Sequence, residues 1–166
     1  DDMKEKETID MIPAQHTGKA IDAESTIELD NEQDAVAFFK IVMERLQNVN
    51  HWKEYAGSIS ASFQLVDQAG REIHRKAEKG DYLKIDVPGP GSLSGEGFDW
   101  VQIEAVERAT GPNTESFGFR VRPTDNPRGR EQNIAHFYSH ESTSSFVIQR
   151  ERNKITASVH DRNTKP

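Results

Sequence analysis

The stretch NEQDAVAFFKIVMERLQN, from Asn31 to Asn48, decides the expected fold because it carries the clearest periodic pattern in the chain. Asp30 or Asn31 can cap the N-terminus of a helix there. The apolar residues recur at the spacing that places side chains on one helix face: Ala35, Phe39, Val42, Met43 and Leu46. A stripe this wide predicts that the helix packs on a sheet and buries this face.

Downstream of the helix the apolar pattern changes from helical spacing to alternation, which is typical of strands. A short strand is also expected before the helix, at Ser25–Asp30. Turn-like clusters separate the runs, and no spacer is long enough for a parallel crossover, so the sheet should be antiparallel. The downstream runs are Ser58–Leu65, Glu72–Ala77, Asp81–Val87, Phe98–Glu107, Ser116–Arg122, Gln132–Tyr138, Ser144–Arg150 and Lys154–His160.

The expected fold is therefore α+β. One main N-terminal amphipathic helix packs on a curved, mostly antiparallel sheet, or on a partly closed barrel, of about seven to nine strands. The 166 residues are expected to form a single domain over 25–162. Residues 1–24 are expected to be a weakly ordered N-terminal tail, and residues 163–166 a C-terminal tail.

Composition limits the function classes. The net charge of −7 argues against a nucleic-acid partner, whose phosphates require a basic surface. The chain has no cysteine, which excludes disulfides, thiolate zinc sites and cysteine nucleophiles. No apolar stretch reaches about 18 residues, so no membrane partner is expected. The chain starts with DDMKEKE rather than methionine, which leaves room for a removed leader; the cytoplasm is the default expectation.

The stretch KGDYLKIDVPGPGSLSGEGFDW, Lys79–Trp100, raises the question of a phosphate-binding loop. Such a loop leads from a strand into a helix, whereas the residues after these glycines alternate like a strand. Pro88 and Pro90 also remove two N–H donors. The stretch is therefore interpreted as a connection between strands, whose glycines, Gly89 and Gly91 among them, allow a ligand to approach closely.

A simple meander predicts which connections share an end of the sheet. Asp67–Gly70, Pro88–Gly97, Pro123–Glu131 and Glu151–Asn153 are expected at one end, and Lys79–Gly80, Ala109–Glu115 and His140–Thr143 at the other. The first end would gather arginines beside the glycine-rich connection: Arg128, Arg130 and Arg152. Because arginine binds carboxylate and phosphate groups, a small anionic ligand or an acidic protein partner is expected there.

The most enzyme-like cluster is His136, His140 and Glu141, with His160 downstream. These residue types suit a metal-assisted or acid–base enzyme, but the two nearby histidines fall on a predicted strand and its turn rather than on a helix face. A triad from Ser139 or Ser144 with His160 and an aspartate, Asp99 or Asp161, lacks a nucleophile motif. No motif indicates a cofactor or a defined metal site.

Trp52 and Trp100 flank loops or element starts, so either can line a small-molecule pocket between helix and sheet, or simply fill the core. The leading hypothesis is a non-enzymatic binding or interaction module. The alternatives are the enzyme centred on the histidines and the pocket between helix and sheet. The sequence does not fix the oligomeric state.

Three segments resemble uncharacterised bacterial hypothetical proteins: GDYLKIDVPGPG (80–91), GFDWV (97–101) and NKITASVHDRN (153–163). The resemblance covers mainly the C-terminal two-thirds and implies no known activity. A helix held by an antiparallel sheet is also similar to the START-like ligand binders. Those typically end in a long helix, whereas this chain ends in a strand and a tail, so none of their properties is carried over.

Overall fold

The computed structural model describes residues 9–56, 62–86, 99–128 and 141–164, with no side-chain description at 55 and 56. Its regular elements are β1 (Lys19–Glu28), α2 (Glu32–Gln47), a single 3-10 turn η1 (Val49–His51), α3 (Trp52–Ala56), β2 (Ser62–Val66), β3 (Tyr82–Asp86), β4 (Asp99–Thr110), β5 (Thr114–Pro123), β6 (Thr143–Glu151) and β7 (Lys154–Thr164). No helix in these ranges is long and apolar enough to cross a membrane.

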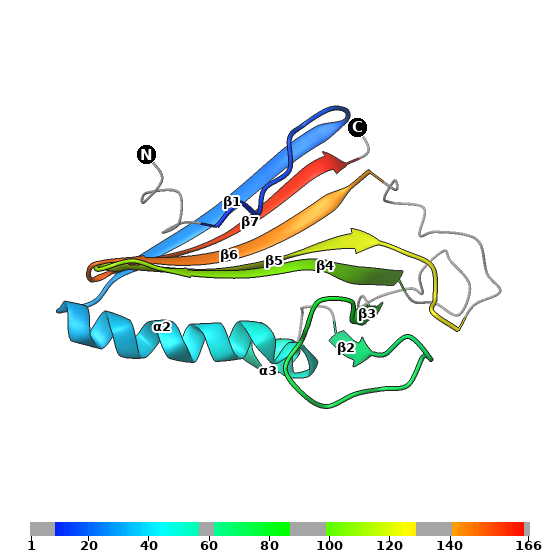
Figure 1. The fold of residues 1–166 in the computed structure, drawn as a ribbon, viewed down its shortest axis with the longest axis horizontal. Coiled ribbons are helices and arrows are strands. Elements are labelled where there is room, and N and C mark those ends of the chain that lie inside the picture. Colours follow the sequence, from blue (N-terminus) through cyan, green and yellow to red (C-terminus); the bar gives the residue numbers. More distant parts are fainter. Residues whose placement is uncertain (1–8, 57–61, 87–98, 129–140, 165–166) are drawn as a thin grey trace.

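Seven strands form one antiparallel sheet in the order β1-β7-β6-β5-β4-β3-β2. The sheet is a meander from β2 to β7, to which the N-terminal strand β1 adds beside the last strand. Figure 1 shows the sheet twisting away from α2 toward β1. Because β1 and β2 do not pair with each other, the sheet is open, and the expectation of a partly closed barrel is wrong.

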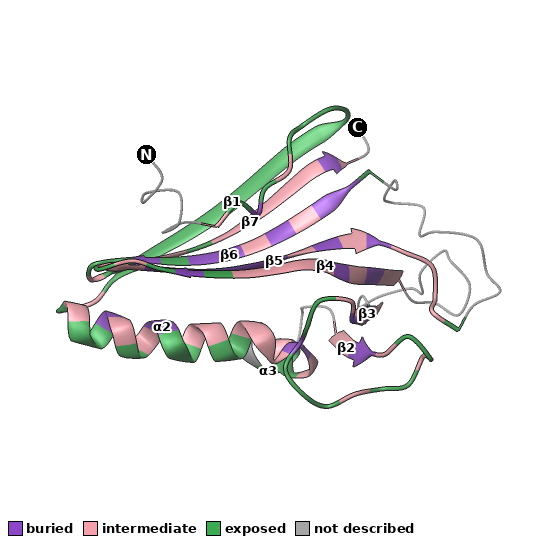
Figure 2. Cartoon of the chain, viewed as in Figure 1, coloured by how far each residue is buried: buried purple, intermediate pink, exposed green. Residues whose placement is uncertain are grey.

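The helix forms where the pattern predicts it. The Asn31 Oδ1 atom caps it by accepting the N–H of Asp34 at 2.8 Å. Ala35 and Phe39 are fully buried, and Val42, Met43 and Leu46 are partly buried against the same core. Figure 2 shows this buried stripe on the side of α2 that faces the sheet.

One strand prediction differs from the structure, and another falls outside the described residues. The run Glu72–Ala77 forms only an isolated bridge, between Glu72 and Val66. Its backbone is bound elsewhere: the Ile73 carbonyl accepts the Asn50 amide at 2.9 Å, and the Ala77 N–H donates to Gln47. The run Gln132–Tyr138 lies outside the described residues.

The range 1–24, expected to be a tail, contains part of β1, which begins at Lys19. Residues 9–18 lie on the sheet face opposite α2. There the buried Met11 carbonyl accepts Arg120 Nη1 at 3.1 Å and Ser145 Oγ at 2.9 Å. At the other end of the chain, Asn163 belongs to β7 and is buried.

An almost buried ion pair ties the start of α2 to the sheet. Arg150 on β6 has a side chain only 5% exposed, and its Nε atom lies 2.7 Å from Glu115 Oε2 on β5. Its Nη1 atom lies 3.0 Å from Glu32 Oε2 in the first turn of α2. The same nitrogen donates to the carbonyls of Asn113 and Arg152. Arg150 therefore joins α2 to two sheet connections.

Candidate functional site

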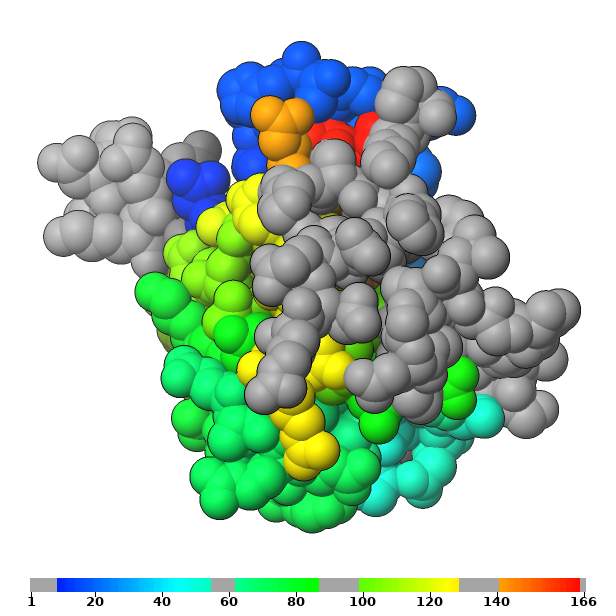
Figure 3. All heavy atoms as spheres, turned by 90° about the vertical axis from the view of Figure 1, so that its right-hand side faces the viewer, coloured from blue at the N-terminus to red at the C-terminus, as the bar shows by residue number. Residues whose placement is uncertain are grey.

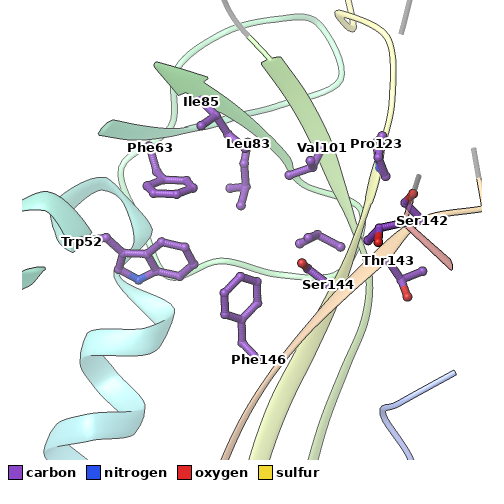
Figure 4. A pocket seen from close by; sticks show the side chains of 12 residues that line it. Trp52, Phe63, Leu83, Ile85, Val101, Pro123, Ser142, Thr143, Ser144 and Phe146 are labelled. Atoms are coloured by element: carbon purple, nitrogen blue, oxygen red, sulfur yellow. The ribbon is translucent and has the colours of Figure 1, made fainter. Parts of the chain in front are cut away.

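An apolar cavity of about 280 Å³ lies between α3 and the α2-facing side of the sheet. Figure 4 shows the side chains of Trp52, Phe63, Leu83 and Phe146 turned toward one another around it. The lining residues are Trp52, Phe63, Leu83, Ile85, Val101, Val121, Pro123, Ser142, Thr143, Ser144, Phe146 and Thr164. The site thus combines one short helix with strands β2 to β7.

The C-terminal end of α2 fixes Trp52. Its indole Nε1–H donates to two carbonyls in the last turn of the helix, that of Arg45 at 3.1 Å and that of Leu46 at 3.0 Å. The ring packs edge-on against Phe63 at 4.8 Å between centroids and tilted against Phe146 at 5.6 Å. One wall of the cavity is therefore a fixed aromatic cluster.

The opposite end of the cavity carries hydroxyl groups. Ser144 Oγ donates to Asp161 Oδ1, and Ser142 Oγ donates to the carbonyl of Asn163 at 3.0 Å. Thr143 Oγ1 is buried without a hydrogen-bond partner. Thr143 alternates with Ser144 along β6, so its hydroxyl belongs to the other face. The Ser144 hydroxyl oxygen can still accept a hydrogen bond, so this end favours a polar group over further hydrocarbon.

Charge near the cavity is acidic. Asp161 stands next to the rim through its bond to Ser144. Asp99 pairs with Ile85 across β3 and β4, which puts it on the cavity side of the sheet. Burial raises the pKa of Asp99 above its ordinary value. Among the lining residues that the structure describes there is no Lys or Arg.

The structure separates the two tryptophans that the sequence singles out. Trp52 lines the cavity, whereas Trp100 alternates with Val101 on β4 and faces the other side of the sheet. There it lines a second pocket, also about 280 Å³, with Lys84, Arg128 and Glu72. The sequence predicted that Trp100 and Arg128 each take part in ligand binding, but it did not predict that they line the same pocket.

The stem of Arg128 lies across the turn at Gly70. A Cβ atom on Gly70 would come within 2.2 Å of Arg128 Cγ, and the backbone φ of +82° also favours glycine. Figure 3 looks at this end of the molecule, where the segment after β5 (yellow) lies against the region between β2 and β3 (green). Arg128 is therefore held in place by a turn that only glycine fits well.

Arg152 does not join Arg128, contrary to the meander prediction. Its N–H donates to the carbonyl of Asn113 at 2.8 Å, in the β4–β5 connection. Because β6 pairs directly with β5 and antiparallel to it, the last residue of β5, Pro123, and the first residue of β6, Thr143, lie at the same end of the sheet. The β6–β7 turn, which contains Arg152, therefore shares an end with Ala109–Glu115, whereas the start of β6 at Thr143 lies at the opposite end.

The predicted histidine cluster is only partly described. His136, His140, Arg130, Gly89 and Gly91 lie outside the described residues, and Glu141 is exposed. Within the described ranges no group of three or more His, Asp or Glu residues could hold a metal ion.

His160 has partners that the sequence did not indicate. Its Nδ1 atom lies 2.6 Å from Asp22 Oδ1, and its Nε2 atom lies 2.9 Å from Ser158 Oγ. Hydrogen bonds from His160 and Arg162 lower the pKa of Asp22. The order resembles a hydrolytic triad, but Ser158 sits mid-strand between β1 and β6. Its surrounding N–H groups belong to strand ladders and cannot form an oxyanion hole, so the cluster ties β1 to β7.

Neither a protein-family model nor a curated protein matches the chain. Among solved structures, the fold is similar to the crystal structure of a hypothetical protein from Helicobacter pylori, with a TM-score of 0.52 and 11% sequence identity. The match covers 93% of this chain and 79% of the Helicobacter chain. At this identity the likeness shows a shared fold and nothing about activity, so the function has to be argued from the site itself.

Proposed function

We propose that the protein is a binding module that takes up a small, uncharged, mostly apolar molecule between α3 and the sheet. The observation that carries the proposal is the apolar cavity of about 280 Å³ with hydroxyl groups at one end. Ligand pockets usually span roughly 300–1,000 Å³, so a ligand at the small end of the range fits. An apolar cavity of roughly 150 Å³ is already enough to bind benzene.

The charge around the cavity favours a neutral ligand. A carboxylate entering the cavity would lose its hydration and meet Asp161 and Asp99, with no cation among the described lining residues to compensate it. An alcohol or amide group can instead donate a hydrogen bond to the Ser144 hydroxyl oxygen, whose own proton is given to Asp161. The proposed ligand is thus an apolar body with one neutral polar end.

Octanol is expected to bind Trp100→Phe protein saturably, with one molecule per chain. This variant leaves Trp52, which lines the cavity, as the sole tryptophan, so its fluorescence reports binding directly. Octanoate, of equal chain length, should bind at least about tenfold more weakly because its charge is desolvated without a partner. In the same background, Val101→Phe should weaken octanol binding at least about tenfold because the ring occupies the cavity.

The matched control is Ile41→Phe, which adds the same ring on an exposed position of α2 and should leave octanol binding unchanged. A thermal melt of each variant checks that the fold is kept. The proposal fails if octanol causes no saturable change in Trp52 fluorescence, or if Val101→Phe and Ile41→Phe affect octanol binding equally.

A second candidate is an anion site on the other face of the sheet, favoured by the meeting of Lys84, Trp100 and Arg128 in one pocket. Among the described residues the guanidinium of Arg128 forms no ion pair. Two cations beside an indole suit a flat carboxylate such as benzoate, although Glu72 in the same pocket opposes it.

Benzoate is expected to shift the backbone amides around Gly70 and Trp100 in a two-dimensional NMR titration. Arg128→Gln should weaken the binding about tenfold, as expected when a charged hydrogen bond is lost. Arg71→Gln removes an arginine whose side chain is 75% exposed from the same turn, and it should change little. Equal effects of the two variants, or no shift at all, would exclude this site.

A further inference from the structure

The outer edge of β1 pairs with no other strand that the structure describes. β1 is ten residues long, and every one of them is exposed. It stands at the end of the sheet and pairs with β7 on one side. In such a strand alternate N–H and C=O groups point away from the neighbour and can pair with another strand. The segment contains neither proline nor glycine, so each of its N–H groups can donate.

The opposite edge of the sheet is protected, and the contrast is informative. β2 has only five residues. The chain folds back along its outer side, where Glu72 bridges Val66 and the Ile73 N–H donates to the carbonyl of Leu65 at 3.0 Å. Short strands and covering segments are the usual means by which proteins prevent edge-to-edge pairing. β1 has neither.

The side chains of β1 also differ between its two faces. Ile21 is 51% exposed and Ile27 is 46% exposed. Together with Ala23 they share the face of Ile155 and Val159 on β7. On the other face, Asp22 is bound by His160 and Arg162 within the same molecule. The exposed isoleucines thus extend an apolar face to the very edge of the sheet.

We propose that this edge pairs antiparallel with the same edge of a second copy of the chain, so that two sheets join into one. Residues opposite each other must share a face, so the two-fold axis has to pass through a residue of β1 and not between two residues. A two-fold axis through Glu24 places Ile21 of each copy opposite Ile27 of the other, and Ala23 opposite Ser25. An axis through Ala23 places Ile27 of each copy opposite Lys19 of the other. An axis through Ser25 places Ile21 of each copy opposite Leu29 of the other, which lies beyond the end of β1.

The axis at Glu24 is therefore the register that pairs all four isoleucines, and it makes the surface self-complementary, as a two-fold interface requires. It also sets two carboxylates opposite each other at the axis, a like-charge pair that opposes association. Charge on Glu24 should thus weaken the dimer, while charge on Glu28, which faces Ala20 in this register, should not. This difference identifies the register experimentally.

Sedimentation velocity of the full chain from micromolar to millimolar concentration is expected to show reversible dimers. Ile21→Lys and Ile27→Lys should each weaken the dimer at least about tenfold, because symmetry repeats each change twice. Glu24→Gln should strengthen it about threefold or more, and the matched control Glu28→Gln should leave it unchanged. Circular dichroism and a thermal melt check that each variant is folded.

Hydrogen exchange on the unaltered protein supplies a test that needs no substitution. The β1 amides that point away from β7 should gain protection as concentration rises, while the amides of β2 should not. The proposal is wrong if the chain stays monomeric at millimolar concentration or if the dimer survives Ile27→Lys. It is also wrong if Glu24→Gln and Glu28→Gln act alike, or if β1 protection is independent of concentration. A monomer that instead pairs through β1 with an extended peptide of another protein would likewise overturn it.

Discussion

Arg150→Met is expected to lower the free energy of unfolding by about 3–5 kcal/mol, the cost of removing one partner from a buried ion pair. The Arg150 side chain is 5% exposed and that of Glu115 is 9% exposed. Without the guanidinium, the Glu115 carboxylate stays buried with no opposite charge, and two sheet connections lose their hydrogen bond to Nη1. Chemical denaturation followed by circular dichroism measures the change.

A second substitution distinguishes the unpaired charge from lost packing. The double variant Arg150→Met with Glu115→Leu should recover at least half of the loss, because a buried pair replaced by apolar residues is often nearly neutral. Arg71→Met, at an arginine that is 75% exposed beside Asp67, should cost less than about 1 kcal/mol. A single Arg150 variant that loses less than about 1 kcal/mol, or a double variant no more stable than the single one, would refute this account of the Arg150–Glu115 ion pair.

Phe39→Ala is expected to cost about 3–5 kcal/mol, the range for removing an aromatic ring from a core. Phe39 has no exposed surface and belongs to the core cluster between α2 and the sheet. Its matched control lies two residues later on the same helix, where Ile41 is 44% exposed. Ile41→Ala should cost less than about 1 kcal/mol. A Phe39 loss as small as this would mean that α2 contributes little to the core.

The helix and the antiparallel character of the sheet could be read from the sequence because both depend on local periodicity. Asn31, Ala35 and Phe39 carry their roles in their spacing alone. The same reasoning failed at Glu72–Ala77, where alternation suggested a strand. There the backbone is hydrogen-bonded to Asn50 and Gln47, more than twenty residues earlier, and not to a neighbouring strand. No local pattern indicates such a contact.

The candidate site was only partly accessible to sequence reasoning for a related reason. Trp52 was identified as a possible pocket residue, but its partner Phe146 comes from β6, a strand far along the chain. The separation of Trp52 from Trp100 depends on which face of β4 each position takes, and this is set by register. The error over Arg152 arose in the same way, from counting strands without knowing their pairing.

The pairing of β1 with β7 has a consequence for biosynthesis. Asp22 and His160, which meet across this pair, are 138 residues apart in the chain. A ribosome adds about 5–20 residues per second, so on the order of ten seconds pass between the synthesis of the two strands. α2 can form locally during this interval, but β1 has no neighbour on either side, and contacts this distant in sequence slow folding. The nascent chain therefore carries a strand with two exposed isoleucines that is open to association with other chains until the last strand is synthesised.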